Sequence, residues 1–366
     1  MTRRADAADA VDAADVATAE NVENTANTAF AARVVAWQRQ HGRHGLPWQG
    51  TRDPYRVWLS EVMLQQTQVS TVLEYYARFL QRFADVQALA AAPQDEVLAL
   101  WSGLGYYSRA RHLHRCAQAV VAAHGGAFPR SSELLATLPG IGRSTAAAIA
   151  AFCFDERAAI LDGNVKRVLT RAFGFDGDLS SAAEEKRLWL QAEALLPAQG
   201  VDSYTQGLMD LGATVCTLRK PACLLCPLSA DCVALAQGAP ERYPVKTRRG
   251  KRGRRAHALL WLRQGKRLWL VRRPETGVWA GLWSLPEFGG AAELEALVEG
   301  WPGTGEWLPT IEHALTHFDW TLQPMAWTLP TRAKRPAAVP EGRWVTRDEA
   351  LAMGLPAPLR KLLLAQ

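Results

Sequence analysis

Apolar side chains recur at helical spacing through residues 30–215, where segments with the period of a strand are rare. Asp53 supplies a capping side chain and Pro54 suits the first position of a helix, so together they predict a helix over residues 55–66. Further helices are expected at residues 94–101, 108–123, 144–154, 165–173, 182–195 and 203–214. Residues 30–215 are therefore predicted to form an all-helical region.

The pattern changes after residue 256. Segments at residues 257–263 and 267–273 are rich in strand-forming residues and flank a Gln-Gly-Lys turn, which is typical of a hairpin. Strands are also expected at residues 315–322 and 324–329. Nine of the fourteen tryptophans lie beyond residue 256, so this segment has the side chains for a core of its own. Residues 256–366 are predicted to form a separate α+β domain.

Two polar segments border these regions. Residues 1–29 are mostly Ala, Asp, Thr and Asn, and their few large apolar side chains cannot offset the entropy lost on ordering, which predicts a disordered acidic tail. Residues 233–255 are predicted to be a basic interdomain linker, because seven lysines and arginines lie between residues 246 and 255. Such a run is usually solvated, with a phosphate contact as the alternative, and it offers a surface for protein partners.

Length and composition set the broad class. A chain of 366 residues suggests about two domains, and 48% hydrophobic with 21% charged residues excludes a wholly disordered or fibrous protein. No uncharged apolar run reaches the ~18 residues of a membrane span. The first residues also lack the apolar core of a signal peptide. A soluble cytoplasmic protein is expected.

The charge is unevenly distributed. The first 29 residues hold six acids and two arginines, a net charge of −4, so with a formal total of +6 the remaining chain carries +10. This excess favours an anionic partner such as nucleic acid.

Four of the six cysteines lie in residues 216–232, at Cys216, Cys223, Cys226 and Cys232, with the spacing C-x6-C-x2-C-x5-C. In a reducing cytosol such a group indicates a metal or iron-sulfur site and not disulfides. A zinc ribbon usually has two C-x2-C pairs and this segment has one, so zinc is the less favoured alternative to an iron-sulfur cluster. The other two cysteines lie in alanine-rich helical segments, where buried packing is expected.

A glycine-containing turn at residues 138–145, Leu-Pro-Gly-Ile-Gly-Arg-Ser-Thr, leads into a predicted helix. Glycines bare the backbone amides at a helix start, which can bind a phosphate without recognising base sequence, although most such turns only join two helices. Asp162, twenty residues after Gly142, makes the pattern more specific. Beside Gly163 and Asn164, an aspartate is ordinarily a turn or cap residue.

Residues 138–145 resemble the helix-hairpin-helix motif of base-excision DNA glycosylases, and Asp162 falls at the position of that superfamily's catalytic aspartate. The cysteine spacing is similar to the [4Fe-4S] loop of the endonuclease III branch. Three further strings narrow the resemblance to the MutY family of adenine DNA glycosylases, over roughly residues 30–366. They are Pro47-Trp48, residues 58–69 (WLSEVMLQQTQV) and residues 103–111 (GLGYYSRAR). The implied fold is multidomain: an all-α glycosylase region with a [4Fe-4S] loop, followed by an α+β MutT-like domain.

The resemblance implies a hydrolase that cleaves the N-glycosidic bond of adenine opposite 8-oxoguanine or guanine in duplex DNA. Glu61 would protonate the adenine, and ionised Asp162 would stabilise the positive charge on the sugar. Asn164 would orient Asp162 or the attacking water, and Ser144 would line the pocket. Ser144 stands where bifunctional members carry the lysine that forms a Schiff base, and a hydroxyl cannot form that imine. A monofunctional enzyme is expected.

Glu61 also has an ordinary interpretation. Most glutamates on helices face solvent. A carboxyl turned toward Val57, Trp58 and Leu64, at neighbouring helical positions, would instead have a raised pKa and keep its proton. The family resemblance favours the second interpretation.

The resemblance also implies which residues contact DNA. The candidates are Gln65, Gln66, Tyr106, Arg109, Gly140, Gly142, Thr316 and His317. Gln66 and Tyr106 would wedge into the base stack when the adenine is flipped out, while packing at a helix edge is the alternative for Tyr106. Arg109 would meet a phosphate.

The C-terminal region is similar to the MutT-like domain that this family uses to recognise 8-oxoguanine, most clearly at residues 277–286 (GVWAGLWSLP). The sequence lacks the Nudix box with its glutamate metal ligands, so pyrophosphate hydrolysis is not expected. The family's Phe-Ser-His recognition loop corresponds to Leu315, Thr316 and His317. Threonine keeps the hydroxyl, but leucine lacks the aromatic ring.

Three other functions compete with this prediction. A thymine glycosylase for G·T mismatches would share the helical scaffold, but the long C-terminal domain argues against it. A non-catalytic lesion-binding protein with an iron-sulfur cluster would need neither Glu61 nor Asp162. A nucleotide pyrophosphohydrolase would need the missing metal ligands. The protein is expected to act as a monomer.

Overall fold

The computed structural model describes residues 25–247 and 252–365. The chain forms two compact units, one from residues 1–61 and 128–248 and the other from residues 62–127 and 249–366. The helical region predicted at residues 30–215 is therefore divided between the two units. Each unit brings together segments that are far apart in the sequence.

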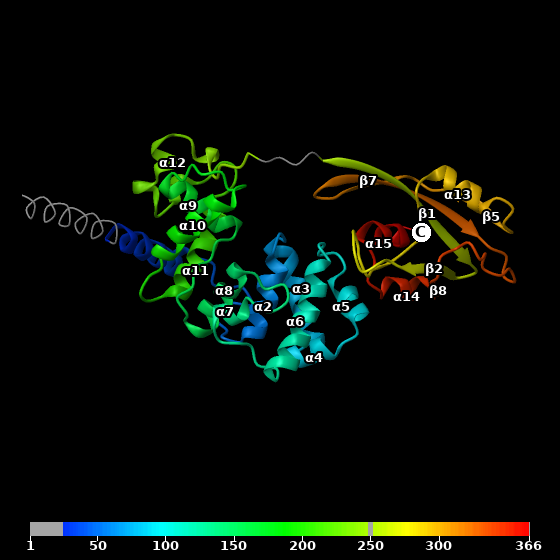
Figure 1. The fold of residues 1–366 in the computed structure, drawn as a ribbon, viewed down its shortest axis with the longest axis horizontal. Coiled ribbons are helices and arrows are strands. Elements are labelled where there is room, and N and C mark those ends of the chain that lie inside the picture. Colours follow the sequence, from blue (N-terminus) through cyan, green and yellow to red (C-terminus); the bar gives the residue numbers. More distant parts are fainter. Residues whose placement is uncertain (1–24, 248–251, 366) are drawn as a thin grey trace, which may run out of the picture. The chain divides into compact units, whose positions relative to one another are not determined.

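The first unit is helical. Figure 1 labels its helices α7 to α12. Its elements are a helix at residues 25–41, α7 (Ser132–Leu135), α8 (Arg143–Phe154), α9 (Gly163–Phe173), α10 (Ala182–Ala194), α11 (Val201–Asp210), the π-helix η1 (Leu211–Val215), the 3-10 turns η2 (Cys223–Leu225), η3 (Ser229–Asp231) and η4 (Pro240–Arg242), and α12 (Val233–Ala236). Helix α2 (Pro54–Leu64) begins in this unit and ends in the second.

Alanine-rich α8 is buried almost all round, as a core helix should be. Its small side chains let α7 and α11 pack closely against it. Phe30, Leu169 and Leu208, from three different helices, belong to one buried cluster beside α8. Ser144 on α8 and the candidates Asp162 and Asn164 at the start of α9 are therefore carried by helices that share one core.

The second unit begins with four helices: α3 (Val69–Arg82), α4 (Val86–Ala91), α5 (Gln94–Trp101) and α6 (Ser108–His124). Helix α3 is amphipathic and buries Val72, Tyr76 and Phe79. Helix α6 ends at Gly125, whose φ of +62° is the left-handed conformation common after a helix. The turn between α5 and α6 holds Tyr106.

The rest of the second unit is an α+β domain. Its strands are β1 (Gly253–Gln264), β2 (Arg267–Arg272), β3 (Trp283–Ser284), β4 (Glu287–Phe288), β5 (Thr304–Trp307), β6 (Ile311–Ala314), β7 (Phe318–Thr328) and β8 (Arg343–Thr346), and its helices are α13 (Ala291–Val298), α14 (Arg347–Leu351) and α15 (Ala357–Leu364). The predicted α+β class is confirmed.

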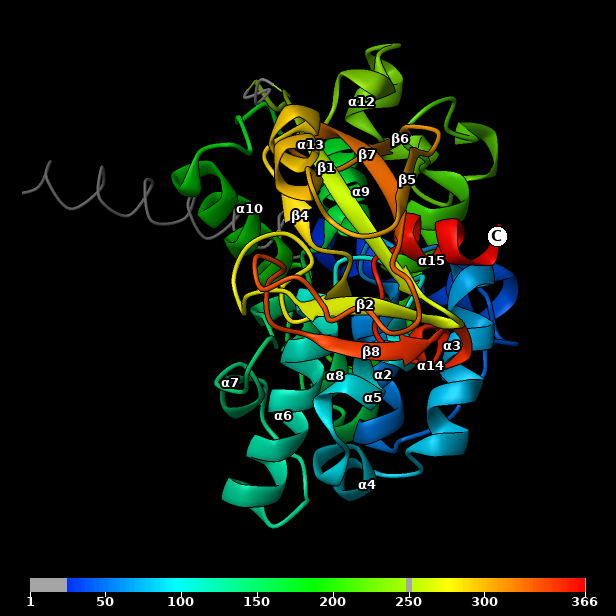
Figure 2. The same cartoon turned by 90° about the vertical axis from the view of Figure 1, so that its right-hand side faces the viewer.

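The sheet has the order β3-β2-β1-β7-β5, with β6 pairing with β7, β4 with β1 and β8 with β2. Figure 2 shows β1 and β7 side by side, and they pair in parallel from Gly253 opposite Phe318 to Arg263 opposite Thr328. The two strands predicted at 315–322 and 324–329 are one strand, β7. Pro324, which cannot donate to a ladder, lies between the part of β7 that pairs with β6 and the part that pairs with β5.

The border segments differ in part from the prediction. Residues 25–29 are helical, although the sequence placed them in the tail, because they continue into a helix that packs into the core through Phe30 and Val34. Residues 1–24 and 248–251 lie outside the described residues. Within the predicted linker, α12 and η4 are ordered, and Leu179 N donates to Val245 O at 3.0 Å.

Candidate active site

The turn before α8 has the geometry that its glycines predict. Gly140 has φ +78°, and Ile141 N donates to Leu138 O at 3.1 Å. Gly142 is the N-cap of α8, and glycine has no side chain that could accept from the amides of the first turn. A Cβ built on Gly142 would meet no described atom within 4 Å, which leaves this helix start open to a ligand.

Asp162 is the N-cap of α9, and its Oδ1 accepts from Val165 N at 2.8 Å. Burial raises the pKa of Asp162. The N–H groups of Val165 and Asn164 and the charges of Arg167 and Lys166 oppose this effect by stabilising the carboxylate. The aspartate is thus held at a helix start, where a negative charge is favoured.

Glu61 lies on α2 and is half-buried, with Val57, Trp58 and Val62 buried at neighbouring helical positions. Burial raises the pKa of Glu61 to about 8, and the charge of Asp162 is the second cause. The two carboxyl groups, 101 positions apart in the sequence, are therefore close enough to interact. At neutral pH Glu61 keeps its proton, which is the property of a general acid.

Ser144 and Asn164 form hydrogen bonds close to Asp162 in the chain. Ser144 Oγ accepts from Leu161 N at 2.6 Å, which ties the start of α8 to the residue before Asp162. Asn164 Oδ1 accepts from Arg167 Nη2 at 2.8 Å. These contacts give both side chains a positioning role. The roles predicted for them, lining the pocket and orienting Asp162 or the water, stay predictions.

Arg167 connects the start of α9 to the cysteine loop. Its Nε donates to Cys216 O at 2.7 Å and its Nη2 to Gly212 O at 2.5 Å. Gly212 packs so closely that a Cβ on it would lie 2.5 Å from the Cβ of Asn164. Only glycine fits where the π-helix crosses the start of α9.

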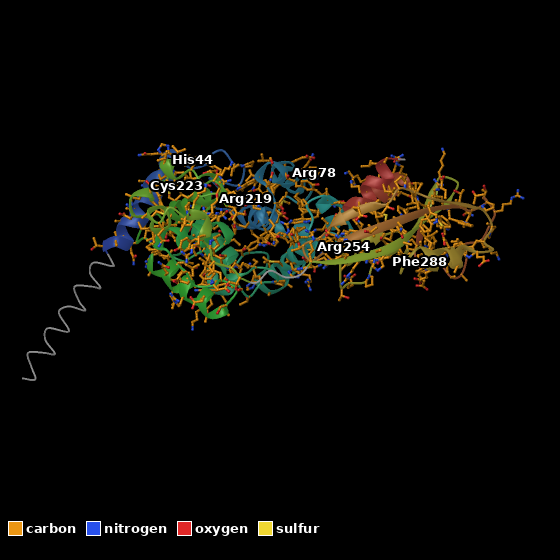
Figure 3. All side chains as sticks on the ribbon, turned by 90° about the horizontal axis from the view of Figure 1, so that it is seen from above. His44, Arg78, Arg219, Cys223, Arg254 and Phe288 are labelled. Carbon is orange, nitrogen blue, oxygen red and sulfur yellow. The ribbon has the colours of Figure 1, made fainter. Side chains whose placement is uncertain are left out.

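The cysteine loop follows this π-helix. Its four cysteines, Cys216, Cys223, Cys226 and Cys232, are half-buried and form no disulfide, and Figure 3 labels Cys223 among them. Buried Arg171 donates from Nη1 to Cys216 Sγ at 3.4 Å, and Cys232 Sγ donates to Arg171 O at 3.4 Å. The loop is therefore built around Arg171.

The four thiols also affect one another. Burial raises the pKa of Cys226 to about 11, and the negative charges of the other three cysteines raise it as well, while the N–H of Leu228 lowers it. Four thiolates this close need a positive centre to stay ionised together, and iron provides one. In the part of the chain that the structure describes, no three His, Cys, Asp or Glu side chains are arranged around a single metal ion. Four cysteine thiolates are the usual ligand set of an iron-sulfur cluster.

Gln66 and Tyr106 share an unusual conformation. Their φ angles are +57° and +46°, which is uncommon for residues other than glycine. Gln66 is exposed, and 46% of the surface of Tyr106 is exposed. Strained, exposed side chains of this kind are concentrated at functional sites. The wedge roles of the two residues stay predictions.

The Tyr106 hydroxyl lies 3.0 Å from Thr316 Oγ1, within hydrogen-bonding distance. Thr316 and His317 are exposed in the turn between β6 and β7, which Leu315 N closes by donating to Phe318 O at 2.9 Å. The structure thus brings together two predicted DNA contacts, from the α5–α6 turn and from the α+β domain.

Arg109 does not lie where its predicted phosphate contact requires. Its Nη1 and Nη2 both donate to acceptors inside the protein. These are Val62 O (2.9 Å), Met63 O (3.0 Å), Gln65 O (2.6 Å), Thr67 Oγ1 (3.0 Å), Leu104 O (3.0 Å) and Gly105 O (3.3 Å). The predicted phosphate contact is therefore replaced by an internal one, because the two terminal nitrogens already donate to six acceptors.

Two family models match the two parts of the chain. Residues 59–192 match the HhH-GPD superfamily of base excision DNA repair proteins, and residues 257–365 match the NUDIX domain. An adenine DNA glycosylase from Buchnera aphidicola subsp. Acyrthosiphon pisum is 34% identical over 341 residues, which cover 91% of this chain and 96% of that protein. The chain belongs to the adenine DNA glycosylase family. The human adenine DNA glycosylase is 33% identical over 402 residues, covering 91% of this chain and 73% of that protein.

Membership in the adenine DNA glycosylase family confirms the predicted family and makes the chain a base-excision repair enzyme that acts on N-glycosyl bonds. A solved structure titled as a thermostable thymine-DNA glycosylase is 30% identical with a TM-score of 0.53. It covers 60% of this chain and 99% of that chain. The adenine DNA glycosylases match 91% of this chain, so they also cover most of the part that the thymine-DNA glycosylase does not match. The comparisons therefore favour the adenine DNA glycosylase over the thymine glycosylase alternative.

Sequence reasoning missed two arginines of this adenine DNA glycosylase family member, Arg167 and Arg171, and gave a third, Arg109, only a phosphate contact. Each donates to backbone carbonyl oxygens in a segment that carries candidate site residues. In the described ranges, 25–247 and 252–365, no helix is both long and apolar enough to span a membrane.

Proposed function

We propose that this protein hydrolyses the N-glycosidic bond of adenine opposite 8-oxoguanine or guanine in duplex DNA, and that it does so without cleaving the strand. The interaction between Glu61 and Asp162 carries the proposal. One carboxyl group has a pKa raised to about 8 and the other is the cap of a helix. Two such groups can divide proton donation from charge stabilisation.

Adenine is a poor leaving group until it is protonated. Protonated Glu61 would donate to N7 of the base as the C–N bond breaks, so that the bonding electrons leave with a neutral adenine. Positive charge then develops on the deoxyribose, and ionised Asp162 would stabilise it or form a transient covalent bond to it. Water completes the hydrolysis. Asn164 is proposed to orient Asp162 or this water.

The absence of an amine nucleophile at Ser144 supports a monofunctional reaction. Its hydroxyl accepts from Leu161 N and cannot form an imine with the opened sugar. Hydrolysis should therefore leave an abasic site in an intact strand.

Adenine within a duplex must be flipped out before it can react, at a cost of a few kcal/mol. Gln66 and Tyr106 are proposed to fill the space that the base leaves, with Gln65 beside them. The open start of α8 at Gly142 and the turn at Gly140 would bind a phosphate through backbone N–H groups. Thr316 and His317 would contact 8-oxoguanine, and the bond between Tyr106 and Thr316 supports a shared role.

The four cysteines would hold a [4Fe-4S] cluster. When bound, the cluster would supply iron centres that keep the thiolates ionised and the loop folded. Arg167 and Arg171 bind this loop and would set its position against α9. We also propose that the protein acts as a monomer on DNA in the cytoplasm, with the segment at residues 233–255 available to protein partners.

Single-turnover release of the base tests this proposal. The substrates are duplexes with A opposite 8-oxoguanine, A opposite G and T opposite G. Release of adenine from the first two and no release of thymine from the third is expected. Thymine release would favour the thymine glycosylase, and binding to all three without any release would favour the non-catalytic lesion-binding protein.

A further inference from the structure

Two neighbouring turns hold Gln66 and Tyr106 in the left-handed region, and each pays a conformational cost. Residues other than glycine persist there only where the surroundings hold them. Gln66 is preceded by the end of α2, whose last carbonyl groups have no partner within the helix. Tyr106 follows the turn after α5. A group that binds the backbone of both turns would therefore hold both wedge residues.

Arg109 contacts both turns at once. On the first turn it donates to Gln65 O and Thr67 Oγ1, the residues on either side of Gln66. On the second it donates to the two carbonyl oxygens before Tyr106, and its guanidinium carbon lies 5.7 Å from the centroid of the Tyr106 ring. One rigid planar group therefore joins the backbone next to both wedge residues.

The end of α2 is bound by the same group. Val62 O and Met63 O, two of the carbonyl groups that the helix leaves without a partner, accept from Arg109 Nη1. Trp101 completes the arrangement, because its Nε1 donates to Gly105 O at 3.0 Å and its ring lies under the guanidinium, 5.2 Å from the guanidinium carbon. The turn before Tyr106 is thus held from two sides.

We propose that Arg109 is a positioning residue that holds Gln66 and Tyr106 in their wedge conformations, so that base extrusion depends on it although it contacts neither DNA nor the reacting atoms. The inference rests on the proposed function, because extrusion matters only if a base is excised. Lysine cannot replace the arginine, since a single ammonium group has three donors at one point and cannot reach six acceptors on two turns.

The test compares Arg109→Lys with Arg115→Lys, the same substitution at an exposed position of the same helix. Adenine release is measured in single turnover from two duplexes, one with A opposite 8-oxoguanine and one with A opposite an abasic-site analogue. The second adenine has no paired base and costs less to extrude. A 2-aminopurine placed next to the target adenine reports unstacking by its fluorescence.

Arg109→Lys should slow release from the paired duplex by about tenfold or more and reduce the 2-aminopurine signal. Release from the abasic-opposed duplex should fall by less than about threefold, and Arg115→Lys should match the wild type on both. Thr67→Val removes one of the six acceptors. It should slow release less than Arg109→Lys does, and again more on the paired duplex than on the abasic-opposed duplex. It keeps the test decisive should Arg109→Lys fail to fold.

Equal losses of Arg109→Lys on the two duplexes, or an undiminished 2-aminopurine signal, would overturn the inference, because a merely structural residue lowers every activity alike. A Thr67→Val variant with no difference between duplexes would count against it equally. Failure of the proposed function looks different: the wild type itself would release no adenine from either duplex.

Discussion

Replacing Glu61 with glutamine should stabilise the protein while removing its activity. Burial and the charge of Asp162 raise the pKa of Glu61 from 4.5 to about 8. Between these two values the native protein holds a proton that the unfolded chain has released. The contribution of Glu61 to stability is therefore fully present below pH 4.5 and is lost as the pH rises through about 8.

The magnitude follows from the shift. At about 1.4 kcal/mol for each unit of pKa, the native state loses roughly 3 kcal/mol by pH 7 and roughly 5 kcal/mol once the carboxyl is ionised in both states. The side chain is half-buried, so solvent reduces these values. Glutamine has nearly the same shape and no charge. We expect Glu61→Gln to raise the free energy of unfolding by about 1–2 kcal/mol at neutral pH.

Urea unfolding at about pH 5, 7 and 9 measures this gain, with Glu133→Gln, an exposed glutamate of α7, as the matched control. The difference between Glu61→Gln and the wild type should grow with pH, while Glu133→Gln should show no such growth. Single-turnover adenine release by the wild type should fall as the pH rises through about 8. In Glu61→Gln, release should be lower by about 10²–10⁴-fold.

The reasoning is refuted if the stability difference is the same at all three pH values, since the carboxyl would then have an ordinary pKa. It is refuted equally if adenine release falls as the pH rises through about 4.5, the ordinary pKa of a glutamate, and not through about 8. A variant that keeps wild-type release would remove Glu61 from the proton-donor role.

Three further predictions concern the other groups. Asp162→Asn should lower single-turnover release by about 10²–10³-fold and leave duplex binding and folding intact, because asparagine caps α9 as well as aspartate does; loss of binding in a gel-shift assay would contradict this. Borohydride added during wild-type turnover should trap no protein–DNA adduct above background, since Ser144 has no amine, and an efficient adduct on a denaturing gel would show lyase chemistry. Cys226→Ser should reduce bound iron and lower the melting temperature by several degrees, and unchanged iron content would argue against its role as a ligand.

The sequence predicts the helices with clear boundary signals best. Residues 94–101 are predicted correctly as α5, because Pro93 marks the start, and the proline and glycines before α8 have the same effect. No element is predicted at residues 69–91, which form α3 and α4. Valines, tyrosines and phenylalanine give α3 little intrinsic helix propensity, and only packing of its buried face decides its structure.

The candidate site was predictable in its residue types but not in its internal connections. Glu61, Asp162 and the four cysteines carry chemistry that their spacing and resemblance indicate. Arg109 also lies in one of the family motifs, residues 103–111. Its partners, however, are mainly backbone carbonyl oxygens, which every residue possesses. No sequence pattern can therefore tell an arginine that binds a phosphate from one that binds two turns of its own chain.

Helix α2 places the chemistry and the wedge within a few residues of each other. Glu61 precedes Val62, whose carbonyl oxygen accepts from Arg109, and Gln66 follows the end of the same helix. A change at Arg109 that lets the end of α2 unwind would therefore disturb Gln66 first and reach Glu61 only through the last turn of the helix. Glu61 is also held by buried neighbours on α2. A conservative substitution at Arg109 should therefore impair base extrusion while leaving proton donation by Glu61 intact. The pH profile of the remaining activity in Arg109→Lys should thus keep its midpoint near 8, with a lower rate at every pH.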